Sequence, residues 1–155
     1  MSINIVPFKS EYAVDFKTLN EAWLKKYFLL EPKDSQILTN CEANIINIGG
    51  YIYFAQLNGQ IVGCYALLPY IHPRQYELSK MAVDPVYQGL KIGQHLLQHL
   101  IQVGQHNQWE KIVLYSSTHL ENAIYIYIKY GFKEIPLEED PPYSRSDIKM
   151  ELILT

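Results

Sequence analysis

Cysteine is scarce in this chain: only Cys41 and Cys64 occur among its 155 residues. Two cysteines this far apart have neither the paired spacing of a zinc site nor the density of a disulfide framework. They are read as reduced structural thiols, which is typical of a cytoplasmic protein. No apolar run approaches the roughly 20 residues of a membrane-spanning helix, and the first eight residues are too short and too polar for a signal peptide. We therefore expect a cytoplasmic protein with no membrane partner.

A surplus of positive charge is also missing. The formal net charge is -3 at pH 7, and the lysines and arginines are scattered along the chain. Because nucleic-acid binding needs a basic face, nucleic acid is excluded as the main partner. Repeats, low-complexity tracts and linkers are absent from the sequence as well. Residues 1–155 are thus predicted to form a single domain, long enough to fold without a metal or a disulfide.

The apolar residues that are present follow clear periodicities. Strands are predicted at residues 3–6, 51–57, 60–68, 75–83, 111–115, 132–137 and 148–154. Helices are predicted around the apolar stripes of residues 8–27, 37–45, 92–101 and 123–130. Asp34 is expected to cap the second helix. A capping box at residues 118–121 is expected to begin the fourth helix. The order β-α-α-β-β-β-α-β-α-β-β indicates an α/β (α+β) fold with a mixed, mostly antiparallel central sheet and about four helices.

The segment from Val83 to Leu97 is the most informative part of the sequence. It runs from a strand through a turn and a glycine-containing loop into a helix. Such a loop directs successive backbone N–H groups at one point, and the helix dipole adds partial positive charge there, which suits a diphosphate. Gly89 and Gly93 would let the backbone approach such a group closely. An ordinary strand-to-helix turn is the alternative, because two glycines before a helix are weak evidence alone.

Two motifs carry a resemblance to a known family. The run Gln88-Gly-Leu-Lys-Ile-Gly93 resembles the [QR]-x-x-G-x-[GA] loop that binds the diphosphate of coenzyme A in the GNAT superfamily of acetyl-CoA-dependent N-acetyltransferases. The run from Ala123 to Phe132 resembles that superfamily's A-x-x-x-Y-x-K-x-G-F helix and strand. Lys91 stands where the family usually has its middle glycine. A helical backbone there would tolerate Lys91, whereas a left-handed one would cost about 1 kcal/mol or more.

The resemblance implies a fold, an activity and a cofactor site. It implies that acetyl-CoA is the co-substrate, that no metal is needed, and that residues 75–83 form the strand whose backbone pairs with the pantetheine arm. The family often has Asn where this chain has Leu120, and Asn122 lies nearby. The implied cofactor-binding residues are Met81, Ala82, Val83, Gln88, Gly89, Leu90, Lys91, Ile92, Gly93, Gln94, Asn122 and Ala123.

The chemistry of amide formation identifies two candidate catalytic residues. The attacking amine must lose a proton, and the resemblance implies Glu77 as the base, with a strand carboxylate that merely binds the amine as the alternative. The thioester oxygen needs a donor such as the backbone N–H of Met81 or Val83. The leaving thiolate needs an acid, and the resemblance implies Tyr127, with a core tyrosine as the alternative. No nucleophilic side chain is required, so Cys64 is not expected to form a covalent intermediate.

The acceptor site is the least readable part of the sequence. We expect the acceptor to be the primary amine of a small molecule. The acetyl group would be transferred to it by direct attack in a ternary complex. Acidic residues near Pro32 would favour a basic amine, or form a solvated loop. Arg145 would bind a substrate carboxylate, or pair with Asp147 or Glu139. The candidate acceptor residues are Tyr27, Glu31, Tyr143 and Arg145.

Two other functions stay open from sequence alone. A CoA-binding sensor without catalysis would keep the loop at residues 88–94, and a protein-interaction module would use the sheet edge. A homodimer also stays open. His95, His99 and His106 fall on one helix stripe with Gln102, which is read as a solvated polar face and not as a metal site, because no third ligand accompanies the pair.

Overall fold

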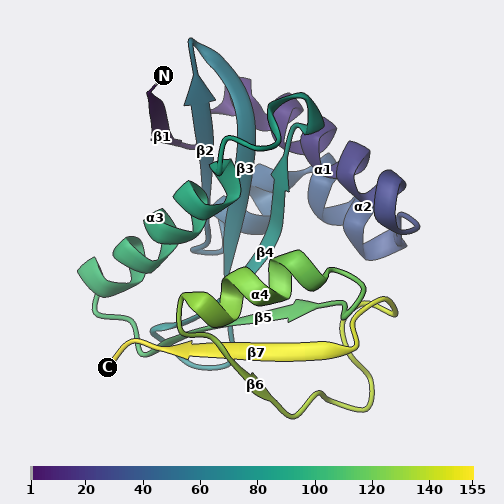
Figure 1. Ribbon diagram of the computed structural model, residues 1–155, viewed down its shortest axis with the longest axis vertical. Helices are drawn as coiled ribbons and strands as arrows, with labels where there is room; N and C mark the ends of the chain where they lie inside the picture. The colour runs from purple at the N-terminus through teal and green to yellow at the C-terminus, as the bar shows by residue number, and fades with distance from the viewer. Residues whose placement is uncertain (1) are drawn as a thin grey trace.

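The protein's structure is a computed structural model that describes residues 2–155, and its elements follow the predicted order (Figure 1). The strands are β1 (Ile3–Pro7), β2 (Tyr51–Leu57), β3 (Gln60–Pro69), β4 (Gln75–Val83), β5 (Lys111–Ser116), β6 (Lys133–Ile135) and β7 (Ile148–Ile153). The α-helices are α1 (Ala13–Tyr27), α2 (Pro32–Thr39), α3 (Ile92–His106) and α4 (Glu121–Lys129). The predicted fold class is confirmed. Within residues 2–155, no helix combines the length and the apolar character needed to cross a bilayer.

The N-terminal helices differ from the prediction in their boundaries. The stripe that starts at Phe8 begins with a 3-10 turn, Ser10–Tyr12, and becomes α-helical only at Ala13. The second helix ends at Thr39, and a π-helical turn, Glu42–Ile46, carries the rest of its apolar stripe. Asp34 is the third helical residue of α2 and not its N-cap residue, which corrects the prediction.

Glu31 caps α2 instead. Pro32 occupies the first helical position, which places the N-cap one residue earlier, and the Glu31 N–H donates to Asp34 Oδ2 at 3.0 Å in a capping box. This arrangement brings the Asp34 carboxylate inward, where it is fully buried.

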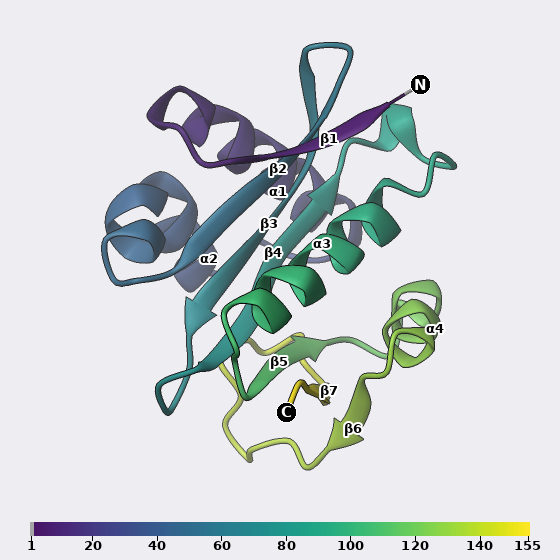
Figure 2. The same ribbon diagram turned by 90° about the vertical axis from the view of Figure 1, so that its left-hand side faces the viewer.

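The seven strands form one sheet with the order β1-β2-β3-β4-β5-β7-β6. All neighbours are antiparallel except β4 and β5, which run parallel. The predicted β2–β3 hairpin turns at Asn58 and Gly59, whose φ angles of 51° and 79° are those of a type I′ turn. Helices α1 and α2 cover one face of the sheet, while α3 and α4 lie on the other (Figure 2).

Each face of the sheet has its own apolar core. On one face, Leu96, Leu97 and Leu100 of α3 pack on β3, β4 and β5, together with partly buried residues of α4. On the other, Phe16 and Leu24 of α1 pack against α2 and the opposite side of β2 and β3. Helices on both faces hold β4 and β5 at the centre of the sheet, and the site forms where these two strands separate.

Candidate active site

The central feature of the site is a divergence of two parallel strands. The pairing of β4 with β5 covers only Gln75–Leu78 and Lys111–Leu114, and beyond it the strands point in different directions (Figure 1). A cavity of about 240 Å³ opens in the gap. Backbone and side chains of both strands line it, together with the end of α1, the start of α4 and the segment before β7.

A β-bulge makes β4 turn away from β5. In the pairing of β4 with β3, Cys64 faces Ala82 and Ala66 faces Ser79, so two residues of β4, Lys80 and Met81, lie opposite the single residue Tyr65. Lys80 has φ 54°, a left-handed conformation that is uncommon for a residue with a side chain. A bulge of this kind bends its strand and redirects the residues that follow, here Met81 to Val83 at the cavity wall.

The predicted diphosphate loop lies between β4 and α3. Gly89 has φ 88°, and a Cβ atom built at Gly89 or Gly93 would meet no other atom within 4 Å, so the backbone surface is open on both. The N-cap of α3, Lys91, makes no side-chain capping hydrogen bond. Because the first N–H groups of a helix have no acceptor within it, this end of α3 presents free donors at the predicted position.

Lys91 adopts the costlier of its two predicted conformations. Its backbone has φ 59° and ψ 29°, in the left-handed region. We expect Lys91→Gly to relieve about 1 kcal/mol of strain and to raise the Tm by about 2–4 °C for a domain of this size. Differential scanning calorimetry checks this, with Lys91→Ala as the matched control, since alanine loses the same ammonium group but keeps the strain. An equal Tm for both variants would contradict the strain argument.

Glu77 lies on β4 and lines the cavity. Burial raises the pKa of its carboxyl above the ordinary value, although the positive charges of Lys33, Lys80 and Lys149 oppose the shift. Among residues 2–155, its carboxylate has no hydrogen-bond or ion-pair partner. A partly buried carboxylate with a raised pKa in a cavity has the properties of a general base.

Tyr127 lies on α4, across the cavity from β4. Burial raises the pKa of its hydroxyl to about 12, so the phenol stays protonated at neutral pH. Ala123 and Leu120 also line the cavity, whereas Asn122 is exposed and outside the lining. The apolar Leu120, which stands where the family often has Asn, therefore lies beside the gap between β4 and β5.

The predicted capping box of α4 is wrong. The N-cap is Leu120, without a side-chain capping bond, because the Thr118 hydroxyl donates to Asp147 Oδ2 at 2.7 Å. The Thr118 N–H also donates to Asp147 Oδ1, at 2.7 Å. These bonds tie the start of α4 to the segment before β7, which forms another wall of the cavity.

A buried ion cluster closes one end of the cavity. Lys80 Nζ lies 2.5 Å from Asp34 Oδ1 and donates to the Tyr143 hydroxyl at 2.9 Å. Arg145 donates to both Asp34 oxygens at 2.7 and 2.8 Å, and to Glu31 Oε2 at 3.2 Å. Burial alone would raise the pKa of the Asp34 carboxyl, but the hydrogen bonds from Arg145 and Lys80 lower it to about 2. We call Asp34, Lys80, Tyr143 and Arg145 the ion cluster.

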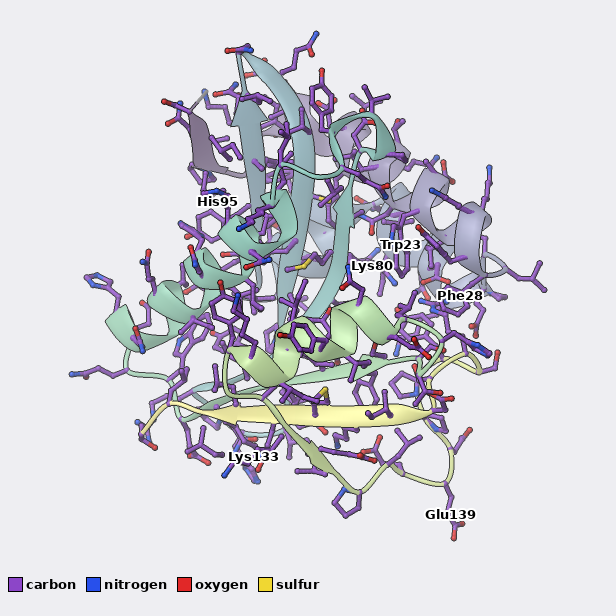
Figure 3. The ribbon with its side chains drawn as sticks, viewed as in Figure 1. Trp23, Phe28, Lys80, His95, Lys133 and Glu139 are labelled. Atoms are coloured by element: carbon purple, nitrogen blue, oxygen red, sulfur yellow. The ribbon has the colours of Figure 1, made fainter. Side chains whose placement is uncertain are left out.

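The ion cluster gives Arg145 partners other than those expected from the sequence. Arg145 pairs with Asp34 and Glu31, and neither with Asp147 nor with Glu139. Of the two acidic residues near Pro32, Asp34 is fully buried and the Glu31 side chain is 23% exposed, and both are paired with Arg145. Trp23 of α1 and Phe28, the residue that follows this helix, lie near Lys80 in Figure 3, and all three line the cavity. Tyr27 is exposed and lies outside the lining.

A second polar network borders the cavity and was missed from the sequence. The Tyr115 hydroxyl donates to Glu138 Oε2 at 2.7 Å and lies 3.2 Å from the Tyr70 hydroxyl. Lys149 donates to Tyr70 at 2.6 Å and is paired with Glu138. The alternation of side chains along β7 could have indicated that Lys149 occupies a buried position. The partners of Lys149 could not be predicted, because they are not its neighbours in the sequence.

The histidine stripe on α3 is predicted to be a solvated polar face, and this prediction is wrong for His99. His95 is exposed, whereas His99 Nδ1 lies 2.8 Å from the Tyr65 hydroxyl and its ring packs 4.7 Å from Tyr53. Figure 3 shows His95 on the far side of the molecule from Trp23. Among the residues that the structure describes, no group of three or more His, Cys, Asp or Glu side chains is placed to hold a metal ion.

The cavity thus gathers residues from six parts of the sequence. From the candidates identified in the sequence it is lined by Glu77, Met81, Ala82, Val83, Gln88, Ala123, Tyr127, Tyr143 and Arg145. The loop residues from Gly89 to Gln94 continue outward from Gln88 and do not line the cavity itself. Glu31 lies behind Arg145.

Comparison with known proteins agrees with this geometry. A family model described as the acetyltransferase (GNAT) domain matches residues 49–134, more than half of the chain. The chain belongs to the GNAT acetyltransferase family. The matched region contains β4, β5 and α4, which line most of the cavity, and also the loop and α3 that lie beside it.

Individual GNAT relatives match at modest identity. An uncharacterised N-acetyltransferase of Schizosaccharomyces pombe is 32% identical over 76 residues, which cover 49% of this chain and 47% of the relative. Rat N-acetyltransferase 8F1 is 27% identical over 93 residues, which cover 57% of this chain and 42% of the relative. The matches therefore span less than half the length of these relatives.

Solved structures match over the whole chain. A GNAT-family acetyltransferase from Staphylococcus aureus Mu50 superimposes with a TM-score of 0.86 at 27% identity, covering 99% of this chain and 100% of that one. The PaiA N-acetyltransferase from Thermoplasma acidophilum, in complex with coenzyme A, gives a TM-score of 0.76 at 19% identity and covers 99% of both chains. At that identity the second match shows the shared fold alone.

Proposed function

We propose that residues 1–155 form a single-domain N-acetyltransferase that transfers an acetyl group from acetyl-CoA to the primary amine of a small molecule. The observation that carries the proposal is the cavity between β4 and β5, which has Glu77 and Tyr127 in its lining and the glycine loop at its outer end. A volume of about 240 Å³ is below the roughly 300–1,000 Å³ of pockets for drug-sized ligands, which favours a small acceptor.

The residues present fit coenzyme A. The free donors at the start of α3 and the open backbone at Gly89 and Gly93 suit a diphosphate held by residues 88–94. The backbone of Met81 to Val83 would pair with the pantetheine arm, with Ala123 on the arm's other side, whereas the exposed Asn122 lies outside the cavity lining. The PaiA structure, which contains coenzyme A in the same fold, supports this assignment. The bound acetyl-CoA supplies an activated thioester.

The proposed chemistry is a direct attack in a ternary complex. An ordinary alkyl amine has a pKa of about 10.4, so deprotonation at pH 7 costs about 4.6 kcal/mol. Glu77 accepts that proton, directly or through a water molecule, while the nitrogen bonds to the thioester carbon. The N–H of Met81 or Val83 stabilises the carbonyl oxygen. The C–S bond then breaks, and Tyr127 donates its proton to the departing sulfur.

Release of free thiol tests the activity. The protein is incubated with acetyl-CoA and a panel of small primary amines, and a thiol reagent reports CoA. An N-acetyltransferase releases CoA only with its acceptors present. A protein that binds CoA in calorimetry but releases none with any amine would be a sensor on the same fold. A protein without measurable CoA binding would be an interaction module, and the proposal would fail.

We expect Gly89→Val to weaken CoA binding by about 10-fold or more. The two γ-methyl groups would cover the backbone surface that the diphosphate approaches, and isothermal titration calorimetry with CoA measures the loss. Gly49→Val is the matched control, because Gly49 also has a positive φ, 96°, and no close neighbour for a Cβ, but lies before β2. Both variants carry similar backbone strain, so equal CoA affinities would place the diphosphate elsewhere.

A further inference from the structure

Lys80 is a buried charged residue with a strained backbone, and both features are unfavourable for the stability of the fold. It has a left-handed backbone at the β4 bulge, and its side chain is 3% exposed. A buried lysine must be paired and hydrogen-bonded to keep its charge. Burial lowers the pKa of its ammonium, and the bonds with Asp34 oppose that shift. The proposed acetyl transfer assigns Lys80 no chemical step, so its burial needs another explanation.

The ammonium end of Lys80 is held by elements from both ends of the chain. Asp34 comes from the first turn of α2, while Tyr143 and Arg145 come from the segment between β6 and β7. Arg145 holds both oxygens of Asp34 in a two-point pair. The two cations, Lys80 and Arg145, are matched by Asp34 and the partly buried Glu31, so the group is close to neutral.

The backbone end of Lys80 is held from the opposite direction. The Cys64 thiol on β3 donates to the Lys80 carbonyl oxygen at 3.6 Å, and the thiol itself accepts from Asn20 Nδ2 at 3.4 Å. Asn20 is buried on α1 and donates also to the Phe16 carbonyl at 3.0 Å. The peptide unit that follows Lys80 is therefore fixed at its oxygen.

That peptide unit also contains the N–H of Met81. In a trans peptide the C=O and N–H groups point in opposite directions, and the described chain has no cis peptide bond. With its carbonyl held toward Cys64, the unit directs the Met81 N–H away from Cys64. Met81 lines the cavity, and its N–H is one of the two proposed donors to the thioester oxygen. The conformation of Lys80 thus sets the direction of a proposed catalytic donor.

We propose that Lys80 is a positioning residue, and that the ion cluster and Cys64 together fix the β4 bulge so that the N–H of Met81 is aimed at the thioester. The inference rests on the proposed function for the identity of the group that Met81 meets. Misplacement of a reacting group by about 1 Å can cost up to 100-fold in rate. Loosening the bulge therefore lowers kcat and has little effect on the affinity for acetyl-CoA, most of whose contacts lie elsewhere.

The test is Lys80→Met, which removes the ammonium but leaves Asp34 paired with Arg145. We expect kcat to fall by about 10-fold with the best amine of the panel, while the KM for acetyl-CoA stays within about threefold. Asp34→Asn should lower kcat at least as much, because it also weakens the pair with Arg145. The double variant should lose less than the two single losses combined, because both substitutions break the Lys80–Asp34 contact. Lys111→Met is the matched control. It breaks the Lys111–Glu151 pair between β5 and β7, outside the cavity.

A second measurement needs no acceptor. Amide hydrogen exchange in Lys80→Met should be about 10-fold faster at residues 80–83 and unchanged in β2 and β7. A folded Lys80→Met variant with kcat within twofold of the wild type, or with unchanged exchange at residues 80–83, would overturn the positioning role. If the wild type acetylates no amine, the proposed function fails, and the exchange measurement still decides whether Lys80 fixes the bulge.

Discussion

Replacing Tyr127 by phenylalanine is expected to lower kcat by about 100-fold or more, with little change in CoA affinity. The substitution removes a single oxygen atom from the cavity wall and keeps the aromatic packing against Phe132. Proton donation by a positioned side chain typically contributes about 10²–10⁴-fold to a rate. Steady-state thiol release gives kcat, and calorimetry with CoA gives the affinity.

The raised pKa of Tyr127 defines what the hydroxyl can do. With a pKa of about 12, it is protonated throughout the working range and so is ready to donate. An ordinary thiol has a pKa of about 8.5, so full proton transfer from Tyr127 to a free thiolate would run uphill. We therefore expect the hydroxyl to act while the C–S bond is breaking, and to recover its proton from solvent afterwards.

Tyr125→Phe is the matched control for this prediction. Tyr125 lies on the same helix, α4, but is 67% exposed and outside the cavity. It reports any general effect of losing a hydroxyl from α4. An unchanged kcat in Tyr127→Phe, or an equal loss in both variants, would remove the acid role from Tyr127.

Elements with strong local patterns could be predicted from the sequence. The hairpin at Asn58 and Gly59, the order of strands and helices, and the glycine loop before α3 each depend on residues close together in the chain. The resemblance predicts Glu77 and Tyr127 from their positions in two segments of the sequence, and both residues line the cavity. The residues of such segments can be identified without knowing the rest of the fold.

The ion cluster could not be predicted, for two physical reasons. Alternation along β4 places Lys80 on the same face as Tyr76 and Leu78, toward α3, but the extra residue of the bulge turns it to the Asp34 side. Asp34 and Arg145 are also 111 residues apart, and local patterns do not reveal contacts at such separation. The lysine next to the apolar end of β4, Met81 to Val83, was the one available signal that the strand is irregular there.

Glu77→Gln is expected to lower kcat at neutral pH by about 100- to 1,000-fold, since the amide cannot accept the proton of the amine. Glutamine keeps the size of the side chain, so the cavity should retain its shape. In the wild type, kcat/KM should rise with pH through the raised pKa of Glu77, and this rise should be absent from the variant. Thiol-release kinetics across a pH series measure both effects.

The same substitution should stabilise the folded protein at neutral pH. Because burial raises the pKa of Glu77 in the folded state, its neutral form favours folding below about pH 4.3, and that contribution is lost as the pH rises through the raised pKa. Glutamine stays neutral at every pH, so Glu77→Gln should have a higher Tm than the wild type at pH 7 and a similar Tm at pH 4.

Glu138→Gln is expected to change the Tm at pH 7 in the opposite direction. Hydrogen bonds from Lys149 and Tyr115 lower the pKa of Glu138 despite the opposing effect of burial, so its charge favours folding at neutral pH and this contribution is lost in acid. The Tm of Glu138→Gln should therefore fall at pH 7, where that of Glu77→Gln rises. A Glu77→Gln variant that loses stability at pH 7, or keeps its kcat, would show that this carboxylate is a structural partner and not a base kept free for the amine.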